Sequence, residues 1–200
     1  CALPEAASPE RVEVGLSRWL EAATEAGFSD FAEQIISDPL VRKALEAVFG
    51  NSPFLTTAMI HDPGFTQRLL TAGPDETFSG IMEGLGSARG KPLEAEALAL
   101  LLRAAKRQTA LTVALADIAG VWPLEKVTGA LSDFAAAARD LFQFRPCAAD
   151  QPKPDVSPEA RAEPETSATH EGPVDHMHGS RPEVEGGFRK AVRDGGTANG

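Results

Sequence analysis

Residues 93–144 read LEAEALALLLRAAKRQTALTVALADIAGVWPLEKVTGALSDFAAAARDLFQF, two long apolar-periodic runs interrupted once, at Gly120-Val121-Trp122-Pro123. In the first run, apolar residues recur at intervals that keep one face of a helix buried. These residues are Leu100, Ala104, Leu111, Leu115, Ile118 and Trp122. The run predicts a helix of about seven turns.

The second run predicts a helix with a narrower apolar face. Its apolar residues step alternately by three and four positions, which is the spacing of a seam against a neighbouring helix. They are Leu124, Val127, Leu131, Phe134, Ala138 and Leu141. Because the gap between the two runs is short, we expect an antiparallel helical hairpin. Gly120 suits the position just past the first helix, and Pro123 suits the first turn of the second.

Short capped helices are expected before the hairpin. A serine or aspartate directly before a proline recurs along this part of the chain and is typical of helix starts. The pairs are Ser8-Pro9, Asp38-Pro39, Ser52-Pro53 and Asp62-Pro63, with Gly73-Pro74 marking a further boundary. No run of alternating or β-branched residues predicts a strand. Residues 1–145 are therefore expected to be all-α.

Residues 146–200 have a different composition. They hold seven of the fifteen prolines, more acidic than basic residues, and a single aromatic residue, Phe188. Such a segment buries too little apolar surface to offset the entropy lost on ordering. It is predicted to be a disordered, acidic, proline-rich tail.

The net charge of −10 disfavours general binding to nucleic acid, because an acidic surface repels phosphates. No apolar run is long enough to cross a bilayer, and Cys1 and Cys147 are not spaced as a metal pair or disulfide framework. These features fit the cytoplasm. A chain that begins at Cys1 would also fit a lipid-anchored lipoprotein, although a fragment or a misplaced start is the simpler account.

Two stretches resemble the amino-terminal helical region of the glutamine synthetase adenylyltransferase family. They are VFGNSPFLTTAMIHDPGFTQRLL, residues 48–70, and LLRAAKRQTALTVALADIAGVWPLEKVTGALSDFA, residues 101–135. Capped short helices are common, so the order and spacing of the motifs make the resemblance specific. It covers roughly residues 10–142 and is expected to end there.

The resemblance implies an enzyme that transfers AMP from ATP to a tyrosine of glutamine synthetase and removes it again. It also implies Mg²⁺, and control by a PII-type signalling protein. Members of this family carry a glycine turn and an Asp-x-Asp pair on a strand, since metal ions held by carboxylates must neutralise the phosphoryl oxygens. This chain has neither, so we predict no catalytic, cofactor-binding or metal-ligating residue and no catalysis by the chain alone.

Other candidate groups have simpler interpretations. Glu94-Ala95-Glu96 is expected to be the acidic first turn of a helix, and Asp117 to pair with basic neighbours. Glu183-Val184-Glu185 and Gly195-Gly196 lie in the predicted tail. So do the histidines that could capture a metal only weakly, which are His170, His176 and His178.

Three further groups are expected on the helices. A basic strip is expected to face solvent or to pair with acids of a neighbouring helix, although it could meet an acidic partner. It consists of Arg103, Lys106 and Arg107. His61 should end a helix. Trp19 and Trp122 should be core aromatics, with Trp122 packing the hairpin onto the amino-terminal helices.

The abrupt change of composition after Leu141 suggests a frameshifted or truncated family member. The leading hypothesis is therefore an all-helical part of the adenylyltransferase without its catalytic core. The alternative is a non-catalytic helical interaction module with a flexible acidic tail.

Overall fold

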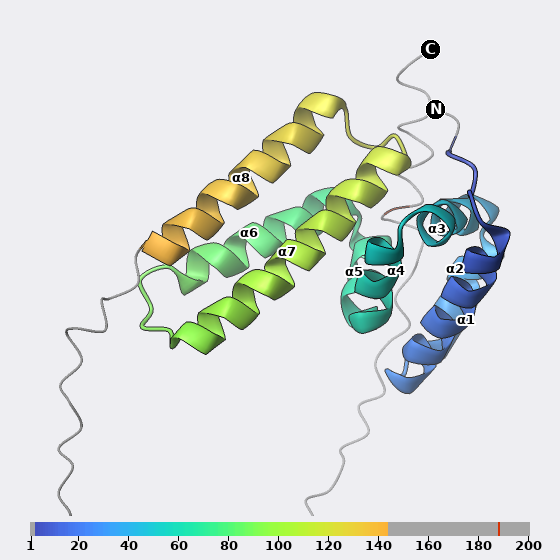
Figure 1. The fold of residues 1–200 in the computed structure, drawn as a ribbon, viewed down its shortest axis with the longest axis horizontal. Helices are drawn as coiled ribbons and strands as arrows, with labels where there is room; N and C mark the ends of the chain where they lie inside the picture. Colours follow the sequence, from blue (N-terminus) through green and yellow to red (C-terminus); the bar gives the residue numbers. More distant parts are fainter. Residues whose placement is uncertain (1–2, 144–187, 189–200) are drawn as a thin grey trace, which may run out of the picture. The chain divides into compact units, whose positions relative to one another are not determined.

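The computed structural model describes residues 3–143 and Phe188, which belong to one compact unit. Eight α-helices and no strand are found within the described residues, so the all-α prediction is confirmed there (Figure 1). The helices are α1 (Pro9–Glu25), α2 (Ser29–Ser37), α3 (Pro39–Asn51), α4 (Pro53–His61), α5 (Pro63–Ala72), α6 (Pro74–Ala88), α7 (Ala95–Ile118) and α8 (Leu124–Gln143).

Side-chain caps fix the starts of four helices. Each of α1, α3, α4 and α5 begins at a proline whose preceding serine or aspartate accepts a hydrogen bond from a backbone amide of the first turn. The bond from the Phe65 amide to Asp62 Oδ1, for example, is 2.9 Å long. Proline loses nothing at these positions, because its missing N–H would have no partner inside the helix. The repeated Ser/Asp-Pro motif therefore predicted the helix starts correctly.

The connection between α7 and α8 is a tight helix-ending turn. Gly120 has φ +66°, its amide donates to the Asp117 carbonyl, and the amide of Val121 donates to the Ala116 carbonyl over 2.8 Å. This pair of bonds satisfies carbonyls that the end of α7 leaves free, and it needs a residue that tolerates positive φ. Pro123 follows immediately, so the chain turns and begins α8.

Helix α7 joins two groups of helices. It packs against α6 and α8, and α6 also packs against α8, so these three helices form one group (Figure 1). On another side α7 packs against α3 and α4, which belong with α1, α2 and α5. One continuous core cluster runs through both groups and includes Leu45, Leu69 and Leu115, all fully buried.

The buried face of α8 differs from the predicted seam. Val127 and Leu141 are buried as expected, whereas Leu124 and Leu131 are 69% and 46% exposed. Helices α6 and α7 both cover α8, so its buried face turns toward the groove between them instead of toward a single neighbour. The apolar face predicted for α7 is wrong in one place as well, because Leu100 is 57% exposed.

Phe188 contradicts the prediction of a wholly disordered tail. Its side chain is fully buried and belongs to the main core cluster. Burial of a phenylalanine removes a large apolar area from water, which favours this position of the side chain. The rest of the predicted tail lies outside the described residues, so its disorder stays a prediction.

Gly15 of α1 allows a close approach between α1 and α3. A β-carbon at this position would lie 2.8 Å from Cγ of Phe49, a side chain that is itself almost fully buried. Gly84 of α6 is the natural control, because a β-carbon there would meet no atom within 4 Å.

We expect Gly15→Ala to lower the free energy of unfolding by about 1–3 kcal/mol, since the methyl group would force apart the packed helices. Gly84→Ala should instead raise it by about 0.5–1 kcal/mol, the ordinary gain from replacing glycine inside a helix. Urea unfolding followed by circular dichroism measures both. Equal stabilisation by the two substitutions would show that α1 does not approach α3 so closely.

Candidate functional site

A polar and aromatic cluster lies where the starts of α6 and α8 meet. The indole Nε1 of Trp122 donates to Asp75 Oδ2 over 3.4 Å, and Lys126 forms an ion pair with the same carboxylate. The Lys126 ammonium also lies 5.0 Å from the centroid of the Trp122 ring. The ring of Phe78 meets Trp122 edge to face, with centroids 5.9 Å apart. We call Asp75, Phe78, Trp122 and Lys126 the α6–α8 clamp.

The chemistry of the clamp is structural. Asp75 is matched by a cation and an indole N–H, and the Lys126 ammonium rests against an aromatic face, which attracts cations. Neither ion pair partner is deeply buried, with side chains 65% and 45% exposed. The ion pair links the starts of α6 and α8, and an exposed pair of this kind contributes about 0–1 kcal/mol.

Trp122 packs onto α6, the helix that directly precedes the hairpin. It is 4% exposed and forms a second core cluster with Val113, Ala116, Val127 and Ala130, with Phe78 against it. Phe78 and Asp75 of α6 reach the indole beside the turn between α7 and α8. The role of Trp122 as a core aromatic is confirmed, and so is that of Trp19, which is 1% exposed.

A second polar link ties α7 to the junction between α4 and α5. The side-chain amide of Gln108 donates to Asp62 Oδ2 over 3.1 Å, while Asp62 Oδ1 caps α5. Asp62 therefore caps α5 and also holds α7 against the junction between α4 and α5. Sequence reasoning found the capping role of Asp62 but missed Gln108 and the clamp residue Asp75, because their partners are about 46 to 51 positions away in the chain and no local pattern marks them.

The predicted basic strip lies on α7 and faces largely outward. Arg103 and Lys106 are exposed and Arg107 is half-buried. None of the three forms an ion pair with another residue that the structure describes, which fits a solvated face. The exposed Asp117 likewise has no ion pair within the described part of the chain, so its predicted pairing is not seen there.

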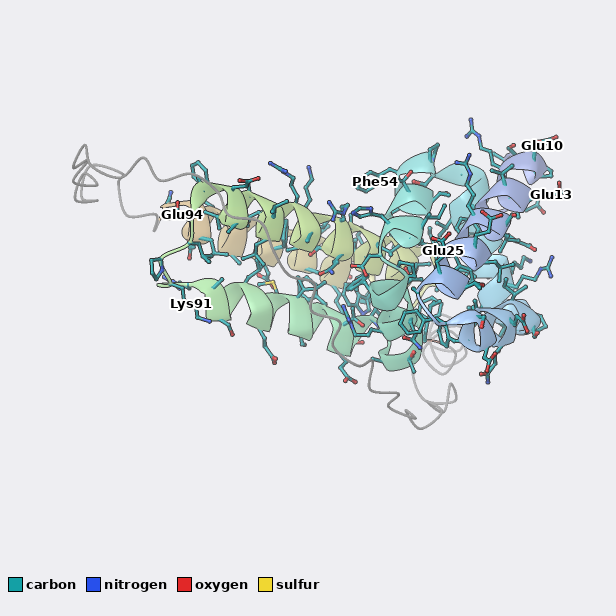
Figure 2. The ribbon with its side chains drawn as sticks, turned by 90° about the horizontal axis from the view of Figure 1, so that it is seen from below. Glu10, Glu13, Glu25, Phe54, Lys91 and Glu94 are labelled. Atoms are coloured by element: carbon teal, nitrogen blue, oxygen red, sulfur yellow. The ribbon has the colours of Figure 1, made fainter. Side chains whose placement is uncertain are left out.

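The acidic residues of α1 and of the first turn of α7 are exposed. Glu96 lies in the first turn of α7, as predicted for dipole stabilisation. Figure 2 shows Glu10 and Glu13 of α1 at the outer edge of the molecule, and Glu25 at the end of the same helix is exposed. The pKa of Glu10 is lowered, because its carboxylate accepts a hydrogen bond from its own backbone amide and another from Ser8 Oγ.

Metal binding gains no support from residues 3–143 and Phe188. Within them, no three histidine, cysteine or acidic side chains are grouped so that they could hold a metal ion. His61 is the last residue of α4, which confirms its predicted helix-end position. The remaining candidates lie outside the described residues, and these are Cys1, Cys147, His170, His176, His178, Glu183, Val184, Glu185, Gly195 and Gly196.

A small hollow between α2, α3 and α5 offers no site for catalysis. Its volume is about 220 Å³, below the usual size of a ligand pocket. Ile35, Val41 and Leu70 supply its apolar wall, and Asp38 is already used to cap α3.

No helix in the described part of the chain is long and apolar enough to cross a membrane.

The clamp makes a prediction for Trp122. Because the indole is buried between three helices, Trp122→Ala should lower the free energy of unfolding by about 3–5 kcal/mol. Trp122→Phe should cost clearly less, since it keeps most of the packing and loses one long hydrogen bond. Urea unfolding measures both, and a loss well under about 1 kcal/mol for the alanine variant would contradict the packing.

Comparison with known proteins identifies relatives of one kind. The family model of glutamate-ammonia ligase adenylyltransferase matches residues 42–166. The bifunctional glutamine synthetase adenylyltransferase/adenylyl-removing enzyme of Bradyrhizobium diazoefficiens is 35% identical over 136 residues, which cover 68% of this chain and 14% of the relative. The enzyme of the same name from Rhodopseudomonas palustris strain HaA2 is 30% identical over 169 residues, covering 80% of this chain and 17% of that protein.

This chain therefore spans only 14% to 17% of the length of these relatives. The family match continues to residue 166, so the prediction that the resemblance ends at residue 142 is wrong. No solved structure matches the chain significantly. The family match covers well over half of the sequence, and the chain belongs to the glutamate-ammonia ligase adenylyltransferase family.

Proposed function

We propose that this chain is the amino-terminal helical part of an enzyme that attaches AMP to a tyrosine of glutamine synthetase and removes it again. The single observation that carries the proposal is membership of the adenylyltransferase family, whose two relatives above are named for both activities. An all-helical arrangement of residues 3–143 fits the role of a scaffold. Within the whole enzyme, this region would support the catalytic core.

The chain alone is proposed to be inactive. AMP transfer places charge on phosphoryl oxygens, and enzymes of this type neutralise it with Mg²⁺ held by paired carboxylates. The sequence has no Asp-x-Asp pair and no glycine turn following a strand pattern. ATP and Mg²⁺ would therefore be bound by parts of the enzyme beyond this chain.

Glutamine synthetase and a PII-type signalling protein are the proposed partners of the whole enzyme, in the cytoplasm. The basic strip on α7 is open to an acidic partner, but a solvated face explains it equally well. The alternative function, a non-catalytic interaction module, predicts no coding sequence for the catalytic core downstream. Reading the DNA after the codon for Leu141 in all frames distinguishes the two, because the enzyme proposal requires that core.

The proposal predicts the outcome of a domain exchange. In the Bradyrhizobium diazoefficiens relative, the segment that corresponds to α1 to α8 is replaced by residues 9–143 of this chain, which contain all eight described helices. The chimera should still add AMP to glutamine synthetase in the presence of ATP and Mg²⁺, because the helical scaffold is retained. The complete 200-residue chain alone should add none. Intact-mass spectrometry of glutamine synthetase measures the added AMP.

The controls separate the two parts of the proposal. The unaltered relative sets full activity, and the relative without the segment shows whether the scaffold is needed at all. AMP transfer by the 200-residue chain alone would overturn the claim that it lacks a catalytic core. A chimera that folds but transfers no AMP, beside an active parent, would overturn the scaffold role.

A further inference from the structure

One side of α8 carries an uncovered apolar line. Leu124, Leu131 and Phe142 are 69%, 46% and 63% exposed. Thr128 and Ala135 lie between them and are also exposed, and Ala138 is half-buried. The six positions step by four and three in strict alternation, which places them along one narrow line of the helix. We call these residues the α8 line.

The α8 line differs from the scattered apolar residues found on any protein surface. The other large exposed apolar side chains of the described residues lie on α1, α3, α4 and α7, one on each helix. Figure 2 shows one of them, Phe54, on α4. Isolated residues of this kind need no explanation, whereas several aligned on one helix mark a contact surface. The line also adjoins the face of α8 that is buried against α6 and α7.

We propose that a second copy of this chain binds the α8 line through its own α8, in antiparallel orientation. A two-fold axis at the level of Asp133 would place Leu131 opposite the partner's Ala135, and Leu124 opposite the partner's Phe142. Thr128 would face the partner's Ala138. At the centre each larger side chain meets a small one, so the two helices can approach closely. Each contact occurs twice, as a two-fold interface requires.

Charges beside the line support the same arrangement. Glu125, Ser132 and Arg139 follow the line at intervals of seven residues. In the antiparallel pair with its axis at Asp133, Glu125 and the partner's Arg139 differ in level by two residue positions, about 3 Å along the helices, so their long side chains can meet, twice. Ser132 lies one position from the axis. A parallel pair would align each residue with its own copy and form neither ion pair.

Both charged residues are available for this contact. The Arg139 side chain is 69% exposed, and its intrachain partner is the adjacent Asp140 at 4.0 Å, the longest separation that still counts as an ion pair. Glu125 is exposed and forms no ion pair with any other residue in the described part of the chain. The α8 line and the charged residues beside it are therefore complementary to the same surface of a second copy.

The expected dimer is weak. One helix face from each copy gives an interface at the small end of specific protein contacts, so we expect dissociation in the micromolar range. Sedimentation velocity of the complete chain, from below to above micromolar concentrations, should show a reversible monomer–dimer equilibrium. Leu131→Asp should make the protein monomeric throughout, with unchanged helix content by circular dichroism, because residue 131 is partly exposed in the monomer.

Charge exchange tests the antiparallel register. Glu125→Arg and Arg139→Glu each replace two attractive pairs by two repulsive ones, and each should raise the dimer Kd roughly tenfold. A mixture of the two variants should regain dimers, because the heterodimer again pairs opposite charges. Glu13→Arg on α1 is the matched control for net charge and should leave the Kd unchanged.

Two results would overturn the proposal. One is a folded chain that stays monomeric at high concentration, which would leave the α8 line to another occupant, such as a following segment of a longer family protein. The other is a dimer that persists in Leu131→Asp, or whose Kd in the mixture of charge variants is no lower than in each variant alone.

Discussion

The structure depends on one apolar core that runs through both groups of helices and includes the buried face of α7. Helices of 9 to 17 residues, such as α1 to α5, are short for independent stability in water and need a shared core. Much of that core lies among α1 to α5 themselves. Helix α7 connects it to α6 and α8: Leu111 and Leu115 are buried, and the neighbours of α7 include α3 and α4 as well as α6 and α8. Small residues along α7, such as Ala105 and Ala116, let these neighbours approach closely.

Polar side chains at the edge of this core link neighbouring helices. Asp62 caps α5 and accepts a hydrogen bond from Gln108 of α7, and Asp75 joins α6 to Trp122 and Lys126. Groups that are already paired in this way are poor candidates for acid–base or metal chemistry. This is the arrangement expected of a supporting region, and it agrees with a chain that spans about one seventh of its enzymatic relatives.

The sequence predicted the local features well and the helix packing less well. Helix starts were predictable because a cap and a proline act within four residues, and the end of α7 because Gly120 tolerates positive φ. The faces of α8 were not, because the periodic pattern cannot tell that both α6 and α7 cover it. Apolar residues cover a wide part of the surface of α8. Two different lines of residues along the helix therefore fit the alternating spacing of three and four. Burial of Phe188 was missed because composition averages over a segment and does not detect one anchoring side chain.

For the candidate site, too, local sequence motifs were predictive and contacts between distant residues were not. The resemblance carried in residues 48–70 and 101–135 identified the family, and the absence of an Asp-x-Asp pair argued against catalysis by this chain. The α6–α8 clamp could not be predicted, since Asp75 and Lys126 lie 51 positions apart and nothing local relates them.

Native-state hydrogen exchange tests most directly whether α7 unites the fold. If it does, the slowest amides of α3, α7 and α8 should exchange with the same free energy and the same dependence on denaturant, that of global unfolding. An opening of α6 to α8 at lower free energy, with α1 to α5 still protected, would contradict the single shared core.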